Sequence, residues 1–293
     1  MELGINIKIR TMKTSIASYY SGLLICLFLI SHSASNGQSE KSVGKKYLSE
    51  LPKIQLSKTS QKYRMTAVYT NMDLYGKFSG KIRVMGDYTR GLDNGMAMWN
   101  NVSISNSGNA DEPFEEGAKQ EYMENFKYLP SDKMVTDKDA FKNFPSSLDN
   151  IYSRNLIWDM MSFEIFAWNY YDSLKLNRTY IIPDINGKFE MSDIGSYSHK
   201  NVTLTWTGIS AVDGELCAII EFNAINNKIE LSMDMIKTRG TEQYCGTVLL
   251  SLKTKNIEKA TMYSGTVQEI EVKGMKDKLL MKTIRELTVD KIQ

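Results

Sequence analysis

Histidine, cysteine and proline are scarce in this chain of 293 residues, which has 2 His, 3 Cys and 5 Pro. Two histidines cannot supply a site of several imidazole ligands, and no Cys-x-x-Cys pair is present, so no zinc site is predicted. The sequence also lacks a Gly-rich phosphate loop and a Gly-x-Ser-x-Gly nucleophile elbow. We therefore predict no catalytic residue, metal ligand or cofactor.

The first 37 residues have the order of a secretory signal peptide. Three basic residues precede the apolar run 23–30, and small polar residues follow it. The run is much shorter than the ~20 residues that a membrane-spanning helix needs. An acylated Cys26 is the alternative, but Ile25 stands where a small residue is required. The sequence predicts a signal peptide over 1–37, secretion across the inner membrane, and a periplasmic or outer-membrane-associated location.

Neither sign of charge is in excess after this leader. Removing residues 1–37 removes three basic residues and Glu2, which leaves 33 of each sign. Because nucleic-acid binding depends on a basic surface, the balance argues against a nucleic-acid partner. Six carboxylates between residues 111 and 124 lack the spacing of a calcium loop, so a solvated short helix is the simpler interpretation.

Period-two patterns dominate the rest of the chain. Polar and apolar residues alternate around 63–69, 78–84 and 96–104, and again in segments from 202 onward, with Asn226-Asn227 interpreted as a turn. Between them, residues 147–174 follow an N-terminal helix signal, and Leu148 to Leu174 contains no Gly or Pro. These patterns predict an α+β fold, in which an antiparallel sheet packs against one long helix of about 147–174.

The predicted organisation is a single domain. A lead-in of residues 38–60 precedes one antiparallel-sheet domain over 61–293, with a helical insert at 108–176. In a simple meander Cys217 and Cys245 lie two strands apart, too far for a disulfide, and are interpreted as buried thiols; another strand order leaves a disulfide open. His199 lies in a polar segment and is expected to be an exposed loop residue.

Three segments carry a resemblance to known proteins: Leu176–Pro183, Thr207–Ile220 and Cys245–Ala260. Their turn-and-strand pattern resembles uncharacterised secreted proteins of Bacteroidetes-type bacteria and is similar to the periplasmic lipoprotein-carrier half-barrel superfamily. The resemblance implies a curved sheet around a helix, whose concave apolar face can hold acyl chains. It transfers no binding residue to a position in this sequence.

A non-enzymatic cell-envelope protein that binds a lipid-like or other hydrophobic small molecule is the favoured hypothesis. Glu164 stands out because it projects from the apolar face of the predicted helix, where it needs a ligand, an Arg or Lys, or a tyrosine hydroxyl as partner. The residues predicted to line the concave face are Trp158, Met161, Phe163, Glu164, Trp168, Tyr171, Trp206 and Met233. The alternative for the apolar members is that they pack on one another as a core.

Two other functions stay open at this point. The first is a scaffold that docks an envelope protein through a sheet edge or the acidic loop 111–124, and the second is a carboxylate-based hydrolase. Three observations would distinguish these hypotheses. An enclosed apolar cavity favours the ligand-binding protein, an exposed apolar patch favours the scaffold, and two convergent carboxylates favour the hydrolase. At most peripheral membrane contact is expected, and the sequence does not specify an oligomeric state.

Overall fold

The computed structural model describes residues 45, 47–137, 139–145 and 149–292. The chain divides into two compact units, Met1–Tyr47 and Leu48–Gln293, and the second contains the sheet and its helix. The predicted signal peptide 1–37 and the first part of the predicted lead-in lie outside the described residues. Residues 48–60 of that lead-in form neither helix nor strand.

Strands make up most of the second unit because its side chains alternate between the two faces. In the first strand, Tyr63, Met65 and Ala67 are fully buried, whereas Lys62 and Arg64 are exposed. The strands are β1 (Gln61–Asp73), β2 (Phe78–Arg90), β3 (Ala97–Ser107), β4 (Ala118–Lys119), β5 (Phe126–Tyr128), β6 (Thr179–Ile181), β7 (Gly187–Glu190), β8 (Gly195–His199), β9 (Thr203–Val212), β10 (Glu215–Ser232), β11 (Ile236–Ser251), β12 (Ile257–Val272) and β13 (Leu279–Ile292).

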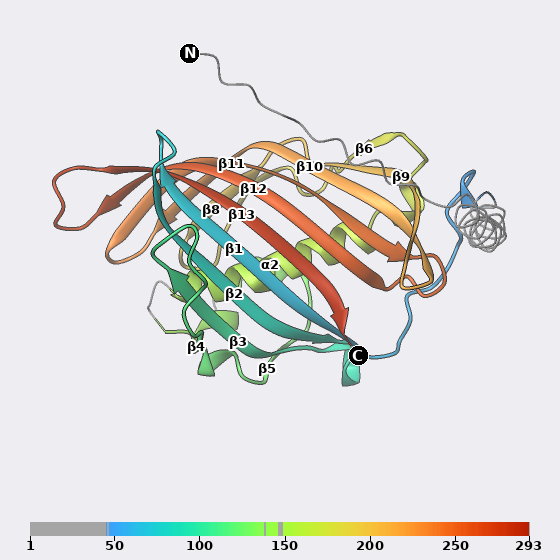
Figure 1. The fold of residues 1–293 in the computed structure, drawn as a ribbon. Coiled ribbons are helices and arrows are strands. Elements are labelled where there is room, and N and C mark those ends of the chain that lie inside the picture. Colours follow the sequence, from blue (N-terminus) through green and yellow to red (C-terminus); the bar gives the residue numbers. More distant parts are fainter. Residues whose placement is uncertain (1–44, 46, 138, 146–148, 293) are drawn as a thin grey trace, which may run out of the picture. The chain divides into compact units, whose positions relative to one another are not determined.

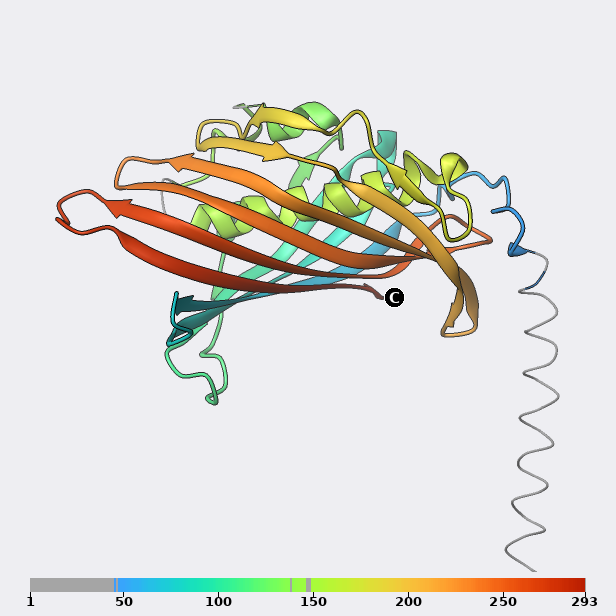
Figure 2. The ribbon, with the colours of Figure 1, turned by 90° about the horizontal axis from the view of Figure 1, so that it is seen from above.

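All of these strands belong to one curved, antiparallel sheet (Figures 1 and 2). Its main path runs β4-β3-β2-β1-β13-β12-β11-β10-β8-β7, with β5 on β3, β9 on β10 and β6 on β9. The first and last strands pair with each other, from Lys62 opposite Ile292 to Asp73 opposite Met281. Because the path ends at β4 and β7, the sheet is not closed. The predicted curved antiparallel sheet with one helix is confirmed at this level.

The helix is shorter than the predicted 147–174. α2 covers Asp149–Trp168, and a short 3₁₀ turn, η5 (Tyr171–Ser173), follows it; residues 147 and 148 lie outside the described residues. Tertiary contacts hold the chain after α2 in this turn, since the Tyr171 hydroxyl donates to the Pro52 carbonyl at 3.3 Å. The absence of Gly and Pro therefore did not decide where the helix ends.

The predicted helical insert 108–176 is also largely non-helical before α2. Its described residues form β4, β5 and the 3₁₀ turns η2 (Glu121–Met123), η3 (Asp132–Val135) and η4 (Asp139–Phe141); another such turn, η1 (Asp93–Gly95), precedes β3. β4 and β5 both pair with β3, so short stretches of this segment extend the sheet instead of forming a helix. The predicted solvated helix over the acidic residues is therefore wrong.

The predicted turn at Asn226-Asn227 is a bulge within one long strand. β10 continues through it, and the register with β11 shifts between Ala224 and Asn227. Asn226 adopts a left-handed backbone conformation (φ 59°), which Asn tolerates better than most residues, and Asn227 is fully buried. The bulge lets β10 pair with β9 through its first half and with β8 through its second.

This continuity changes the positions of the two cysteines. Cys217 and Cys245 lie on the adjacent strands β10 and β11, but Cys217 is opposite Ser251 and Cys245 is opposite Asn223. Both thiols are free, which agrees with the predicted absence of a disulfide. Cys217 is buried as predicted, whereas Cys245 is exposed because it projects from the outer face of β11.

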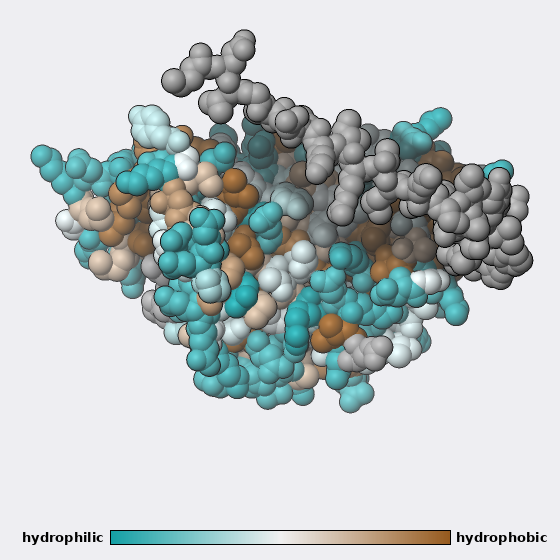
Figure 3. Space-filling view, in the orientation of Figure 1, coloured by the Kyte–Doolittle hydropathy of each residue, from teal (hydrophilic) through white to brown (hydrophobic). Residues whose placement is uncertain are grey.

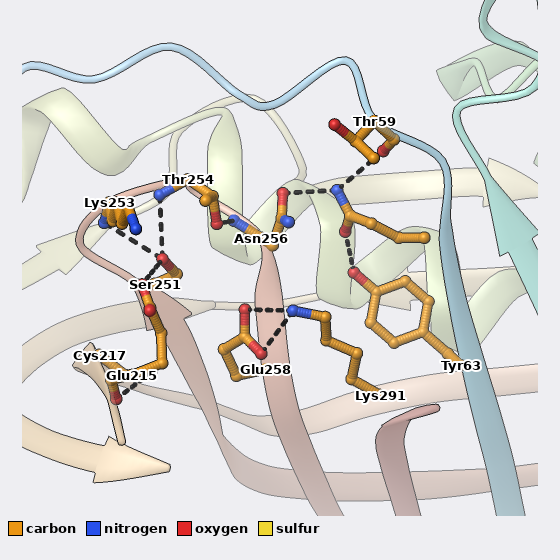
Figure 4. Close-up of polar contacts among 11 residues, drawn as sticks. Thr59, Tyr63, Glu215, Cys217, Ser251, Lys253, Thr254, Asn256, Glu258 and Lys291 are labelled. Carbon is orange, nitrogen blue, oxygen red and sulfur yellow. Dashed lines mark hydrogen bonds and ion pairs between the residues drawn. The ribbon is translucent and has the colours of Figure 1, made fainter. Parts of the chain in front are cut away.

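Native-state alkylation is expected to modify Cys245 and to spare Cys217. Burial raises the pKa of the Cys217 thiol to about 12, with nearby Glu258 and Glu215 adding to the shift. The thiol donates to the Glu215 carbonyl at 3.4 Å (Figure 4). Since the thiolate is the reactive form, Cys217 reacts only after unfolding. Iodoacetamide labelling followed by peptide mass mapping measures each site separately, and equal native labelling would contradict this placement.

A polar network fixes the strand ends near the β11–β12 turn (Figure 4). The Ser251 hydroxyl donates to Glu215 Oε1 at 2.5 Å and accepts hydrogen bonds from the backbone N–H groups of Lys253 and Thr254. Across β12 and β13, Lys291 Nζ pairs with Glu258 at 2.8 Å. The turn between β11 and β12 is thereby tied to the strands on both sides.

α2 lies on the concave side of the sheet (Figure 2). It is buried on several faces rather than along one stripe, and its fully buried side chains include Leu156, Ile157, Met160 and Ala167. Phe163 and Phe166 pack on Phe222 of β10, with ring centroids 5.8 and 4.8 Å apart. Burial on this scale is the main stabilisation of the helix.

The outer face of the sheet is more polar. Figure 3 shows hydrophilic residues over much of this face, with apolar residues in small groups between them. Tyr263 and Val267 of β12 are the large side chains exposed near its middle. In the part of the chain that the structure describes, no helix combines the length and apolar character needed to cross a membrane.

Candidate ligand cavity

A cavity of about 970 Å³ lies between α2 and the concave face of the sheet. Its walls come from one side of α2, from inward-facing residues of β1 and of β10 to β13, and from the segment 184–189 that leads into β7. Figures 1 and 2 show how the sheet curves around the helix at this position.

The register of the strands explains why space remains there. Near the start of β1, inward positions carry large residues such as Tyr63 and Met65, which are fully buried. Farther along the neighbouring strands, inward positions carry short polar residues: Ser264 lies opposite Arg285, and Thr266 lies opposite Thr283. These short side chains fill less of the space beneath α2, so the concave face is packed at one end and hollow at the other.

Apolar side chains form much of the wall around this space. They come from α2, from the C-terminal ends of β10 and β12, and from the N-terminal ends of β11 and β13. Examples are Met161, Ile165 and Phe166 of α2, Ile229 and Leu231 of β10, Ile236 of β11, Ile270 of β12 and Met281 of β13, with Met233 from the segment between β10 and β11. Small-molecule sites typically combine such walls with a few polar groups.

One charged cluster provides those polar groups. Arg285 Nη1 of β13 donates to Asp159 Oδ2 of α2 at 2.9 Å, and Arg285 Nη2 donates to Glu242 Oε1 of β11 at 3.4 Å. The third donor of this guanidinium, Nε, bonds Ser264 Oγ at 3.3 Å. Tyr197 donates to the other oxygen of Glu242 at 2.5 Å. The cluster therefore contains two carboxylates and one cation.

Burial governs the electrostatics of this cluster. It raises the pKa of Asp159 from its ordinary value of 3.8 to about 6, an effect that Arg285 opposes and Glu242 reinforces. Burial lowers the pKa of Arg285, but the charges of Asp159 and Glu242 outweigh it, and the net shift is upward. Arg285 therefore stays charged while Asp159 titrates close to neutral pH.

His199 lies beside the cluster rather than in an exposed loop, which corrects the sequence expectation. It is the last residue of β8 and lines the cavity. Tyr244 OH lies 3.1 Å from its Nε2, and burial lowers the pKa of the imidazole to about 4, although Glu242 acts in the opposite direction. The ring is therefore neutral at physiological pH. Among the described residues, no group of three or more His, Cys, Asp or Glu side chains could hold a metal ion.

The structure places three of the eight predicted lining residues in the cavity. Trp158 and Met161 contribute from α2, and Met233 contributes from the segment between β10 and β11. The others lie elsewhere in the fold and do not line it: Phe163, Glu164, Trp168, Tyr171 and Trp206.

Aromatic members of this second group have packing roles. The Trp168 ring lies 3.9 Å from the Arg90 guanidinium, and its indole N–H donates to the Lys255 carbonyl at 2.8 Å. Tyr171 packs under the Lys255 ammonium at 4.3 Å. Trp206 is fully buried and donates to the Gly208 carbonyl at 2.8 Å. These three residues therefore pack within the protein, as the alternative to cavity lining stated.

Glu164 has both kinds of protein partner that its position requires. Its Oε1 accepts from the Tyr88 hydroxyl at 2.8 Å and from Arg90 Nε at 2.9 Å. Burial raises the pKa of its carboxyl, while Arg90 and the Tyr88 hydrogen bond oppose that shift. Glu164 is therefore part of a structural ion pair at the packed end of the sheet.

The charged residues of the cavity were missed at the sequence level. Arg285 occupies the same phase of β13 as Leu287 and Val289, which are buried, so it was a polar residue on an apolar face. A polar residue among apolar positions is the same signal that drew attention to Glu164. Glu242 occupies an equivalent inward position on β11, but it could be recognised only with the correct length of that strand.

The fold and the cavity define an α+β protein with an open, curved antiparallel sheet around one helix. No protein-family profile and no curated protein matches the sequence. A weak structural similarity links the chain to a DUF1329 family protein from Desulfovibrio piger, with 11% identity, a TM-score of 0.15, and coverage of 79% of this chain and 86% of that one. Similarity at this level supports no functional argument, so the functional case depends on the cavity.

Proposed function

We propose that this chain is a non-enzymatic cell-envelope protein that binds a hydrophobic small molecule between α2 and the concave face of the sheet. The observation that carries the proposal is the cavity of about 970 Å³. Small-molecule sites typically enclose about 300–1,000 Å³. The envelope location is supported by the signal-like order of residues 1–37 in the sequence.

The cavity wall suits an elongated apolar ligand. Met161, Ile165 and Phe166 lie along one side of α2, and Leu231 and Met233 lie at the far end of the sheet. Methionine side chains adapt to ligands of different shape because they are unbranched and polarizable. The charged cluster at Arg285 would then lie at the polar end of the ligand.

Native mass spectrometry of protein purified from its own envelope fraction tests this proposal. The expected result is a co-purifying organic molecule of lipid-like mass that an organic solvent extracts. Uptake of the neutral dye Nile red by the extracted protein is the second measurement. A ligand-free mass together with no dye uptake would overturn the proposal.

Filling the cavity with a larger side chain is expected to weaken binding. Ser162 of α2 lines the cavity, and its hydroxyl bonds only the Trp158 carbonyl among the described residues, at 2.9 Å. Ser162→Trp should reduce Nile red affinity by about tenfold or more, which corresponds to ~1.4 kcal/mol of lost contact. Ser79→Trp, at an exposed position of β2 outside the cavity, is the matched control and should bind as the original protein does.

A carboxylate-based hydrolase is the second candidate, because one specific observation favours it. Asp159 and Glu242 converge on Arg285 inside the cavity, and the pKa of Asp159 is raised to about 6 by burial, as a general acid requires. Release of nitrophenol from a panel of nitrophenyl glycosides tests it. Activity that Asp159→Asn and Glu242→Gln abolish, but Asp290→Asn at the exposed Asp290 retains, would support hydrolysis; no turnover would remove this candidate.

A further inference from the structure

The hydrogen bonding of Arg285 restricts which polar group a ligand can place in the cavity. Three of its five N–H groups, one on each nitrogen, already donate to a protein oxygen: Nη1 to Asp159, Nη2 to Glu242, and Nε to Ser264. A carboxylate or phosphate usually binds by taking two parallel bonds from a guanidinium. Here such a ligand would compete with the two carboxylates that already pair with Arg285.

The charge of the cluster works in the same direction. Asp159 and Glu242 contribute two negative charges against the single positive charge of Arg285. The neighbouring groups do not reverse this balance, because burial keeps His199 neutral and raises the pKa values of Tyr69 and Tyr244. At about pH 8, where Asp159 is ionised, the cluster is therefore net negative, which opposes an anionic head and attracts a cationic one.

Asp159 also retains an available acceptor. Its Oδ2 accepts from Arg285, while no hydrogen bond to its Oδ1 is formed by the described residues. The side chain lines the cavity and is 12% exposed. A carboxylate oxygen in this setting can accept a charge-assisted hydrogen bond from an ammonium group, which is stronger than a bond between neutral groups.

We infer that the cavity binds an amphiphile whose polar end is a cationic amine, with Asp159 Oδ1 as the acceptor and the alkyl part along the apolar wall. This inference rests on the proposed function, since it assigns the ligand class of the same cavity. Lys188, also on the wall, is 58% exposed and pairs with Glu230 at 3.7 Å, so it does not supply an alternative anion site deep in the cavity.

Three probes of equal chain length test the inference: dodecylamine, dodecanol and dodecanoate, each below the concentration at which it forms micelles. Isothermal titration calorimetry with the full chain at about pH 8 should give an affinity for the amine about tenfold or more above that for the carboxylate. Asp159→Asn should remove most of this difference. Asp290→Asn, in an exposed ion pair with Lys259 on the outer face, should leave it unchanged.

Titration of the site provides a measurement that does not depend on a variant. Besides Asp159, the groups around it are Arg285 from β13, Glu242 and Tyr244 from β11, Tyr69 from β1, and Tyr197 and His199 from β8. Lowering the pH from about 8 to about 5 should weaken dodecylamine binding and leave dodecanol binding unchanged, because Asp159 takes up a proton.

The outcomes separate this inference from the proposed function. If dodecanol or dodecanoate binds at least as well as dodecylamine, the cavity binds hydrophobic ligands but the amine assignment is wrong. If none of the three binds, and Nile red is not taken up, the proposed function itself fails. Amine binding that Asp159→Asn leaves intact in a variant with native circular dichroism would also overturn the role of Asp159.

Discussion

Replacing Arg285 with methionine is expected to destabilise the fold by about 3–5 kcal/mol at neutral pH, the range for removing one partner of a buried ion pair. Arg285 is the cation that pairs with both Asp159 and Glu242. Without it, two largely buried carboxylates lie next to each other, and Ser264 and both acids lose a hydrogen-bond donor. Urea denaturation measures the change in the free energy of unfolding.

The pH dependence of this loss identifies its electrostatic origin. The pKa of Asp159 is raised from 3.8 to about 6 by burial, so its ionisation costs stability progressively as the pH rises through this interval and by a constant amount above it. Removing Arg285 raises this pKa further, because the guanidinium is the group that favours the ionised form. The deficit of Arg285→Met should therefore be smaller at about pH 5 than at about pH 8.

A matched substitution separates this effect from the general loss of an arginine. Arg64 pairs with Asp87 at 2.8 Å on the outer face, and its side chain is 55% exposed. Arg64→Met should change stability by only about 0–1 kcal/mol, since solvent screens such pairs. Equal losses for the two variants, or a loss for Arg285→Met that is the same at both pH values, would contradict the account of the cluster.

Replacing Trp206 with alanine is expected to cost about 3–5 kcal/mol of stability, the range for truncating a large buried aromatic side chain. Trp206 lies on β9, is fully buried, and donates to the Gly208 carbonyl. Truncation leaves a void and removes the indole donor of the Gly208 carbonyl. Because Trp206 does not line the cavity, ligand affinity at a temperature where the variant is folded should not change.

Thermal unfolding and Nile red titration together measure both parts of this expectation. Tyr75→Ala is the control, because Tyr75 is 97% exposed and its truncation should change stability by no more than about 0.5 kcal/mol. A Trp206→Ala variant that keeps its stability but loses the ligand would mean that Trp206 belongs to the binding site, as the sequence hypothesis stated.

Local patterns were sufficient to predict the kind of fold. Alternation of side chains placed strands at 63–69, 78–84 and beyond 202, and the apolar density of Leu156 to Ala167 predicted a helix buried against them. These features depend on neighbouring residues in the sequence, and on burying the faces that they create. The same reasoning correctly predicted that Glu164 needs a partner such as an Arg, a Lys or a tyrosine hydroxyl, but only the structure identifies Arg90 and Tyr88.

Register and long-range pairing were decided only by the tertiary structure. The bulge at Asn226-Asn227 keeps β10 continuous, and it thereby sets which side chains of β10 and β11 face inward. Asp159, Glu242 and Arg285 come from α2, β11 and β13 and meet only after the sheet has curved around the helix. The sequence by itself determined an antiparallel sheet with a buried helix, because period and burial are local. The cavity and its charged cluster were decided by tertiary packing, because they depend on where distant strands place short and charged side chains.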